Sequence, residues 1–439
     1  MERARSSERR RSTATRYQTR EGRLAGLALA VASACSGATG PVESPRRGDA
    51  PAEAAPAEVA LVESWPVEVP RGRDALPQTA AVWIEMIDGA RASIDAAHFY
   101  AARGDALEPV IAALERAAGR GVAIRLLLDR LFHEQYPELA QRLALQPGVE
   151  VRLLDGASAY GGVLHCKYFV IDRRELFVGS ANLDWRALTH IHELGLRVRA
   201  PALAAWLSSL FTLDWALAGG APLDEARARA RAAAVGARRR ATVRFADEET
   251  ALELAASPTG WLPDEPEGSS WALPRLVALL DRARARVRVQ LLSYEPRFRD
   301  ARPFLTLDAA LRRAADRGVA VELLLSHWSV GPEKIAALRA LDEHPGIELR
   351  IAAIPPWSGG EIPFARVVHA KYAIVDDDVA WLGTSNWSGD YFHHSRNVEL
   401  FIDGRALAGA LAAVFDALWT APVTTSLAAW PFEQVEPDE

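Results

Sequence analysis

The sequence has 439 residues, too many for one ordinary domain, and 49% of them are hydrophobic, which is ample for a globular core. The formal net charge is −6, but residues 1–34 hold eight Arg against three Glu, and removing this surplus of +5 leaves −11 on the remainder. An acidic body of this kind is not typical of a protein that coats nucleic acid nonspecifically, although it is compatible with a local basic groove.

The N-terminus has the layout of an export signal. An Arg-rich stretch to Arg23 precedes an apolar run, 24–34, which ends in small residues before Cys35. The run is about half the roughly 20 residues of a membrane-spanning helix. Residues 32–35 also resemble a bacterial lipoprotein cleavage box, with Ala where Leu is usual. Residues 1–35 therefore predict an exported protein, either secreted or tethered to the bacterial cell envelope through lipid on Cys35. The alternative is a disordered basic tail on a cytoplasmic protein.

Cysteine usage predicts neither a disulfide scaffold nor a zinc site. Only Cys35 and Cys166 are present, so an acylated Cys35 would leave a single thiol in the body. After the signal, residues 36–59 are rich in Ala, Pro, Gly and Glu, which is typical of a flexible tether.

The body of the chain is an internal duplication. Residues 110–128, which read as a helix, a Gly stop and an apolar strand, are echoed by residues 307–325. A second match pairs 147–153 with 345–351, in the same order. The repeats predict two homologous halves, 60–218 and 246–425, joined by a partly helical linker, 219–245, and followed by a C-terminal tail, 426–439.

Each half alternates strands with helices. Expected strands in the first half are 93–100, 122–128, 149–154 and 168–171, and in the second half 287–293, 319–325, 347–352 and 372–375. Alternation of this kind predicts crossover connections, hence an α/β fold with mostly parallel sheets and helices on both faces.

The same polar motif follows at the equivalent point of each half. It consists of a His, a Lys two residues later, an Asp, and then a Gly-rich turn with a hydroxyl residue and an Asn. The spacings agree residue for residue between His165, Lys167, Asp172 and Asn182 in the first half and His369, Lys371, Asp376 and Asn386 in the second.

Residue types at this spacing predict a phosphate site. Alternate side chains of an extended strand share a face, so each His and its Lys point into one pocket. The turn after the second apolar stretch returns hydroxyl, amide and backbone donors, which phosphate oxygens prefer. One copy alone would be compatible with a structural His and a solvated Lys, but a fold requires no ionisable pair at two equivalent turns, so we interpret the duplicated motif as catalytic.

The paired motifs resemble the His-Lys-Asp signatures of the phospholipase D superfamily, and the resemblance covers nearly all of residues 60–425. Residues 179–189, 193–195 and 383–392, with the opening 61–64, are most similar to the branch of animal endolysosomal proteins called phospholipase D types three and four. The resemblance implies a pseudo-twofold arrangement of the halves around one active site, with no cofactor and no metal, and with no oligomer needed to complete it.

The resemblance also implies roles for matching residues. One His attacks phosphorus to form a phosphohistidine while the other protonates the leaving oxygen and then activates water. His165 is then the expected nucleophile and His369 the expected acid. The Lys and Asn side chains hold the phosphoryl oxygens. Glu193 and Glu399, which lie 11 and 13 residues past their Asn, are expected to orient the histidines. Asp172 and Asp376 are expected either to support the pocket and close a turn or to act directly in catalysis.

Several residues near the motifs admit two interpretations. Aromatic residues close to them either stack a base or acyl chain or pack in the core: Trp185, Trp387, Tyr391 and Phe392. Neighbouring histidines lack partner ligands at metal spacing, which favours surface or supporting roles: His190, His192, His393 and His394. Cys166 alternates away from the pocket and is expected in the core.

The motif predicts that the enzyme acts on a phosphodiester bond, but it does not predict which molecule contains that bond. The branch resemblance favours a 5' exonuclease on single-stranded DNA or RNA. The superfamily name favours hydrolysis or headgroup exchange on phospholipids, near which a lipid anchor would place the enzyme. A noncatalytic binding module is the third alternative, and two intact motifs argue against it.

Overall fold

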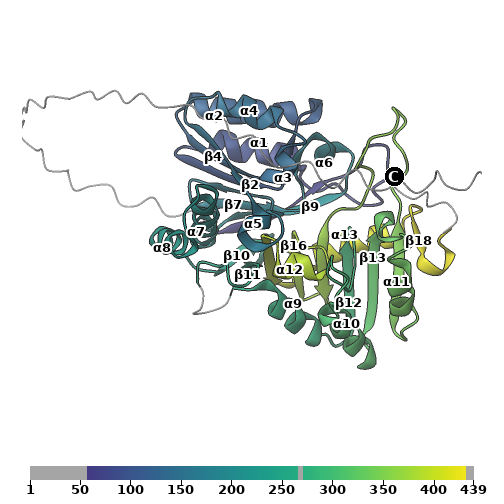
Figure 1. Cartoon of the computed structure of the whole chain (residues 1–439). Coiled ribbons are helices and arrows are strands. Elements are labelled where there is room, and N and C mark those ends of the chain that lie inside the picture. Colours follow the sequence, from purple (N-terminus) through teal and green to yellow (C-terminus); the bar gives the residue numbers. More distant parts are fainter. Residues whose placement is uncertain (1–56, 265–269, 432–439) are drawn as a thin grey trace, which may run out of the picture. The chain divides into compact units, whose positions relative to one another are not determined.

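The computed structural model describes residues 57–264 and 270–431 (Figure 1). The predicted export signal, Cys35 and nearly all of the predicted tether, and most of the predicted C-terminal tail, lie outside these residues.

The first half begins with a strand and ends with its longest helix. Its strands are β1 (Glu58–Ser64), β2 (Ser93–His98), β3 (Ala101–Ala102), β4 (Ala123–Asp129), β5 (Val149–Leu154), β6 (Tyr168–Ile171), β7 (Glu175–Gly179), β8 (Leu183–Asp184) and β9 (Glu193–Arg199). Its helices are α1 (Thr79–Gly89), α2 (Glu108–Gly119), α3 (Arg130–His133), α4 (Glu138–Ala144), α5 (Gly156–Tyr160), α6 (Trp185–Thr189) and α7 (Pro201–Ala218).

The second half repeats this order. Its strands are β11 (Glu248–Ser257), β12 (Arg286–Leu291), β13 (Ala320–Ser326), β14 (Ile347–Ala352), β15 (Lys371–Val375), β16 (Val379–Gly383), β17 (Asn397–Asp403) and the short β18 (Thr424–Ser426). Its helices are α9 (Ala272–Asp281), α10 (Thr306–Asp316), α11 (Ile335–Asp342), α12 (Gly389–His393) and α13 (Arg405–Trp419). The predicted duplication is thus present in the main elements, whereas β3, β8 and α5 have no counterpart in the second half and β18 has none in the first.

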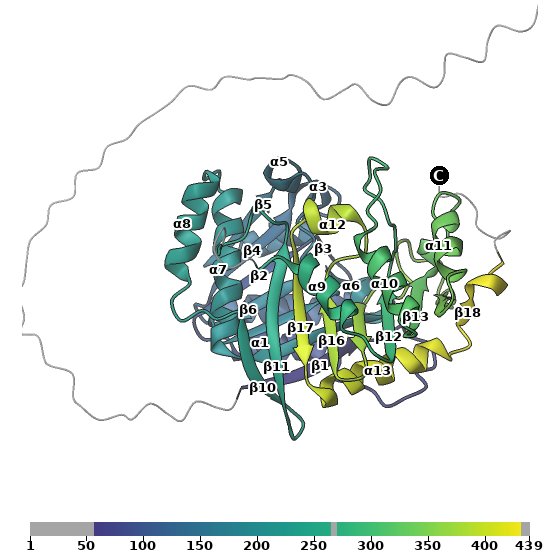
Figure 2. The same cartoon turned by 90° about the horizontal axis from the view of Figure 1, so that it is seen from below.

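One large sheet runs through both halves. Its strand order is β18-β14-β13-β12-β15-β16-β17-β11-β10-β1-β9-β7-β6-β2-β4-β5, so the six strands from β5 to β9 mirror the six from β14 to β17. Figure 2 shows the central strands β17, β11, β10 and β1 between the halves. The α/β class and the two equivalent halves are confirmed, whereas the sheet is mixed rather than mostly parallel.

Tight hairpins explain the antiparallel strands. Within each half of the large sheet, only the strands joined by crossover helices are parallel: β2, β4 and β5, and β12, β13 and β14. The separate two-stranded pair β3 and β8 is also parallel. The strand after each motif instead turns back at once, through Asp172 and Arg173 or through Asp376 and Asp377, all with φ between 51° and 57°. Two consecutive left-handed residues form a type I′ turn, which fits the twist of an antiparallel hairpin and which Asp tolerates well.

Helices cover both faces of the sheet. In the first half α1, α2 and α4 pack on one face, and α9, α10 and α11 do the same in the second half. The other face carries α7 and α13, whose apolar side chains share one core that extends across the two halves. Among the described residues α7 alone is long and apolar enough to cross a membrane, and most of it is buried in this core.

The segment expected to link the halves contributes to the fold. Residues 219–245 contain α8 (Leu223–Ala233) and β10 (Arg240–Phe245), a strand that pairs with β11 and β1 in the middle of the sheet. β18 likewise pairs with β14 at the sheet edge. The many Arg residues of 219–245 are compatible with a strand because alternate residues of β10, among them Arg240 and Arg244, are exposed.

Candidate active site

The two motifs come together in one cavity between the halves. His165 precedes β6 and His369 precedes β15, and both line a cavity of about 230 Å³ together with Asn182 and Asn386. Backbone hydrogen bonds hold the two motif segments across the halves: the amide of His165 donates to the carbonyl oxygen of Arg396 (2.9 Å), and the amide of His369 donates to that of His192 (2.9 Å). Neither half alone contains the complete site.

A neutral amide orients His165. Its Nδ1 lies 3.0 Å from Oδ1 of Asn397, the first residue of β17. The amide orientation of Asn397 is fixed, because its Nδ2 donates to the carbonyl oxygen of Tyr391 (2.8 Å) and its Oδ1 also accepts from the hydroxyl of Thr384 (2.9 Å). An oxygen there only accepts, so Nδ1 carries the proton and Nε2 keeps its lone pair. Burial and the two lysines, Lys167 and Lys371, also hold the pKa of His165 well below its usual value.

A carboxylate orients His369. Nδ1 of His369 lies 2.9 and 2.8 Å from the two carboxylate oxygens of Glu193, the first residue of β9. Burial lowers the pKa of His369, but the charge of Glu193 acts in the opposite direction. Since a carboxylate stabilises an imidazolium and an amide carbonyl does so much less, His369 is the better proton donor of the two and His165 the better nucleophile.

The motif lysines lie buried beside the histidines. Nζ of each donates to the carbonyl oxygen of its own motif His, Lys167 to His165 and Lys371 to His369. Burial lowers the pKa of both ammonium groups; that of Lys371 falls to about 7, with Glu193 and Glu399 acting in the opposite direction. Because little negative charge nearby balances the positive charge of the two side chains, they are suited to bind an anionic ligand such as a phosphate.

The motif asparagines line the cavity but differ in their partners. Asn386 accepts from the backbone amide of Ser293 (3.3 Å) and donates to the hydroxyl of Tyr391 (3.1 Å). Oδ1 of Asn182 is buried and has no hydrogen-bond partner among the described residues. The structure thus brings both asparagines to the cavity that the two histidines line, and their binding of phosphoryl oxygens stays a prediction.

The structure places Asn397, not Glu399, against His165. Glu399 instead accepts from the hydroxyl of Ser385, and its carboxylate lies where a Cβ on Gly383 would be. Burial raises the pKa of Glu399 to about 8, so it also lacks the settled negative charge of an orienting carboxylate. The sequence holds the signal for Asn397: it lies 11 residues past Asn386, the offset that separates Glu193 from Asn182.

The motif aspartates bind backbone at the far end of the hairpins from the histidines. The carboxylate of Asp172 accepts from three consecutive amides, those of Arg91, Ala92 and Ser93, at 2.7 to 2.9 Å. Asp376 accepts from the amides of residues 284–286 at 2.8 to 2.9 Å. Partial burial raises the pKa of each aspartate, but the three amides outweigh it and the pKa is lowered. Of the two expected roles, the contacts favour support of the fold.

Asp172→Ala is therefore expected to lower stability and leave catalysis intact. Loss of an acceptor for three amides should reduce the free energy of unfolding by about 1 to 3 kcal/mol, with kcat of the folded enzyme unchanged within about 2-fold. Because the native pKa is depressed, the stabilisation is present above the unfolded pKa of about 4 and is lost as pH falls through the native value. Urea titrations at pH 7 and pH 3 measure both effects; a collapse of kcat without loss of stability would assign Asp172 to catalysis instead.

Aromatic rings lie beside His165, and most of them are far from the sequence motifs. The ring centroids of Phe99 and Tyr391 lie 5.0 and 4.9 Å from that of His165. The same wall of the cavity also contains Tyr100, Phe132 and Tyr136, and the ring centroids of Phe132 and Phe99 lie 4.0 Å apart. Of the aromatic residues that the motifs suggested, Tyr391 belongs to this wall, whereas Trp387 and Phe392 are buried in the second-half core and Trp185 packs on His190.

The histidines beside the motifs have supporting contacts. His192 is buried between Glu63 and Gln290, His190 packs against Trp185 and Trp357, and His393 and His394 lie beside Phe298. Within residues 57–264 and 270–431 no group of three or more His, Cys, Asp or Glu is arranged to hold a metal ion. Cys166 is fully buried in the core, as expected.

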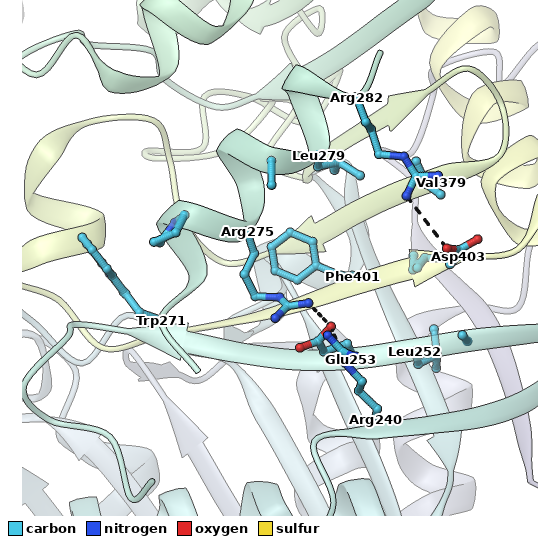
Figure 3. Close-up of a pocket in the computed structure, with 14 residues that line it drawn as sticks. Arg240, Leu252, Glu253, Trp271, Arg275, Leu279, Arg282, Val379, Phe401 and Asp403 are labelled. Carbon is cyan, nitrogen blue, oxygen red and sulfur yellow. Dashed lines mark hydrogen bonds and ion pairs between the residues drawn. The ribbon is translucent and has the colours of Figure 1, made fainter. Parts of the chain in front are cut away.

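A larger groove lies elsewhere and contains none of the motif residues. It has a volume of about 640 Å³ and runs between α9 and strands β11 and β17 (Figure 3). Its charged side chains are paired, Arg275 with Glu253 and Arg282 with Asp403. Size alone therefore does not identify the reactive site, and the smaller cavity with two histidines, two asparagines and the lysines beside them does.

These features define a class of enzyme. Two imidazoles, one held neutral and one beside a carboxylate, face a single cavity with two buried ammonium groups and two amides. This arrangement supports attack on phosphorus, protonation of the leaving oxygen and stabilisation of phosphoryl charge. The fold and the site are those of a phosphodiesterase built from two repeats.

The family model described as "Cardiolipin synthase, PLD-like domain" matches the chain twice, at residues 83–215 and 276–419, and the chain belongs to the phospholipase D superfamily. It is 32% identical to "5'-3' exonuclease PLD3" of Bos taurus, covering 85% of this chain and 81% of that protein. It is 31% identical to "Phospholipase D Z" of Dictyostelium discoideum, covering 78% and 85%. The structure of a Haemophilus influenzae phosphatidylserine synthase has the same fold, with a TM-score of 0.55 at 15% identity, covering 82% of this chain and 87% of that one.

Proposed function

We propose that the protein is a metal-independent 5' exonuclease that degrades single-stranded DNA or RNA through a phosphohistidine. The observation that carries this proposal is the wall of aromatic side chains beside His165, which includes Phe99 and Tyr391. Phosphoryl transfer itself needs no aromatic wall, whereas nucleobases stack on aromatic faces with little regard to sequence. Similarity to a relative named as a 5'-3' exonuclease supports the same substrate class.

The reaction begins with attack by His165. Its Nε2 lone pair is free because Nδ1–H donates to Asn397, so the imidazole attacks phosphorus without first losing a proton. Lys167, Lys371, Asn182 and Asn386 bind the phosphoryl oxygens and stabilise the charge of the five-coordinate transition state.

His369 completes both steps. In its protonated form, held by Glu193, it donates a proton to the departing oxygen. The neutral imidazole then accepts a proton from water, which attacks the phosphohistidine and regenerates His165. Glu193 thus serves both steps by fixing the ring and the proton on Nδ1.

Phospholipid cleavage is the second candidate. It is favoured by the name of the Dictyostelium relative and is served by the same groups, because the histidines act on the phosphodiester and not on its substituents. The aromatic wall also accepts an acyl chain or a glycerol backbone, so substrate assays must decide between the two.

Activity on a single-stranded oligonucleotide with a 5' hydroxyl is expected to persist in excess EDTA. Two lysines and two asparagines supply the charge stabilisation that a metal would otherwise provide. Two assays in the same buffer test the substrate and the metal requirement together: release of mononucleotides from the 5' end of the oligonucleotide, and hydrolysis of phosphatidylcholine in vesicles. Complete loss of activity in EDTA, with recovery on addition of zinc or magnesium, would overturn the metal-independent mechanism. Cleavage of the vesicles without cleavage of the oligonucleotide would overturn the proposed substrate.

A further inference from the structure

Two exposed aromatic side chains stand at the rim of the cavity, on the side of the second half. Trp328 is 37% exposed and Phe364 is 68% exposed, although both line the same cavity as His165 and His369. Their ring centroids lie 6.4 Å apart and their planes meet at 87°. The pair thus forms a corner with open aromatic faces beside the reacting groups.

The backbone keeps Phe364 in this exposed position at a cost. Its φ is 58°, in the left-handed region that a bulky side chain rarely adopts. Anchors hold it from both sides: Arg186 donates to the carbonyl oxygen of Pro363 (3.0 Å), and the amide of Arg366 donates to that of His190 (3.0 Å). The buried guanidinium of Arg366 adds bonds to two further carbonyl oxygens.

Trp328 is also fixed through its backbone. It lies in the short 3₁₀ turn η2 (His327–Ser329), where its carbonyl oxygen accepts a hydrogen bond from Nζ of Lys334 (3.4 Å). The hydroxyl of the following residue, Ser329, donates to the carbonyl oxygen of Leu292 (2.9 Å). Fold stability offers no reason to strain one large apolar residue and expose two at an active-site rim. Strained positions of this kind concentrate where ligands bind.

We propose that Trp328 and Phe364 are a stacking platform for a base of the single strand next to the nucleotide being removed. A planar base stacks on one ring while its edge meets the other, which orients the strand and places its scissile phosphate between the histidines. This proposal rests on the proposed nuclease function and names the residues that bind the strand beside the reacting phosphate.

The surroundings of the platform favour a nucleic acid over a membrane. A membrane-binding surface needs a contiguous apolar patch. Among the described residues that line the cavity, Trp328 and Phe364 are the only large hydrophobic ones that are exposed. The rim therefore presents two aromatic rings and no contiguous apolar patch, which fits a base better than a bilayer.

Single and double replacements, Trp328→Ala and Phe364→Asn, test the platform. Asn removes the ring but adopts the left-handed conformation readily, so the loop is retained. Each variant is expected to lose about 5- to 150-fold in kcat/KM on a 5'-hydroxyl oligonucleotide. Hydrolysis of methyl p-nitrophenyl phosphate, whose single ring is the leaving group and which has no neighbouring nucleotide to reach the platform, should stay within about 2-fold of wild type. Leu145→Ala, which truncates an 83% exposed leucine away from the cavity, is the matched control and should change neither activity.

An oligonucleotide with an abasic residue at the second or third position from its 5' end sharpens the test. Wild type should cleave it more slowly than the normal strand, and the double variant should cleave both equally. An abasic penalty that persists in the double variant, or variants with normal oligonucleotide kinetics, would overturn the platform while leaving the nuclease function intact. A wild-type enzyme that cleaves vesicles but no oligonucleotide would instead overturn the proposed function, and with it the platform.

Discussion

His369→Ala is expected to release a burst of p-nitrophenolate from a p-nitrophenyl diester, and His165→Ala is expected to release none. An acid matters chiefly when the leaving alkoxide is too basic to depart alone, and p-nitrophenolate departs readily. Without His369 the attack by His165 therefore proceeds, but water is no longer activated and the phosphoenzyme accumulates. Without His165 no covalent intermediate forms.

Natural diesters should not separate the two histidines. On an oligonucleotide each replacement is expected to lower kcat by about 10² to 10⁴-fold or more, because an alkoxide leaving group needs both nucleophile and acid. His344→Ala, at a histidine near the end of α11 and remote from the cavity, is the control for loss of an imidazole. A burst from His165→Ala and not from His369→Ala would reverse the assignment that Asn397 and Glu193 support.

Asp214→Ala is expected to cause the largest loss of stability among single changes outside the cavity. Asp214 of α7 and Arg396, just before β17, are both fully buried and are joined by hydrogen bonds of 2.9 to 3.1 Å. The guanidinium also donates to the carbonyl oxygens of Ser257 and Trp261 (both 2.7 Å). Removing one partner leaves a buried charge without compensation, which costs about 3 to 5 kcal/mol.

Urea unfolding of the variant measures this loss, with Asp281→Ala as the matched control. Asp281 pairs with Arg313 on the surface, where such a pair contributes about 0 to 1 kcal/mol. The double variant Asp214→Ala, Arg396→Met should recover part of the stability, because no unpaired charge remains. Activity should fall as well, since the carbonyl oxygen of Arg396 accepts from the amide of His165 and the next residue orients its ring. A change below about 1 kcal/mol in Asp214→Ala would contradict this role for the pair.

The sequence was sufficient to predict the duplication and the meeting of the two motifs at one cavity. Two copies of a His-x-Lys pattern at identical spacing predict a phosphate site because ionisable pairs are not needed for folding at either position. The period-2 geometry of a strand then places each His and Lys together. The contacts of Glu193 with His369 agree with the role that the family resemblance implied.

The remaining features depend on contacts between distant segments. The sequence does not single out Asn397, because the family resemblance implies a carboxylate and Glu399 lies two residues later, although the spacing points to position 397. Phe99 and Phe132 reach the cavity from the ends of β2 and β4, which no local pattern predicts. The mixed sheet follows from left-handed turns at Asp172 and Asp376, whereas helix and strand alternation suggested crossovers throughout.

Location of the covalent intermediate tests the shared active site most directly. Wild type and His369→Ala are mixed in EDTA with thymidine 3'-(p-nitrophenyl phosphate), a nucleotide diester whose leaving group needs no acid, quenched at alkaline pH to preserve phosphohistidine, digested, and mapped by mass spectrometry. The expected result is a nucleotidyl adduct on the peptide that contains His165, more abundant in His369→Ala than in wild type. An adduct on the peptide that contains His369, or substrate turnover with no adduct on either histidine, would contradict the account.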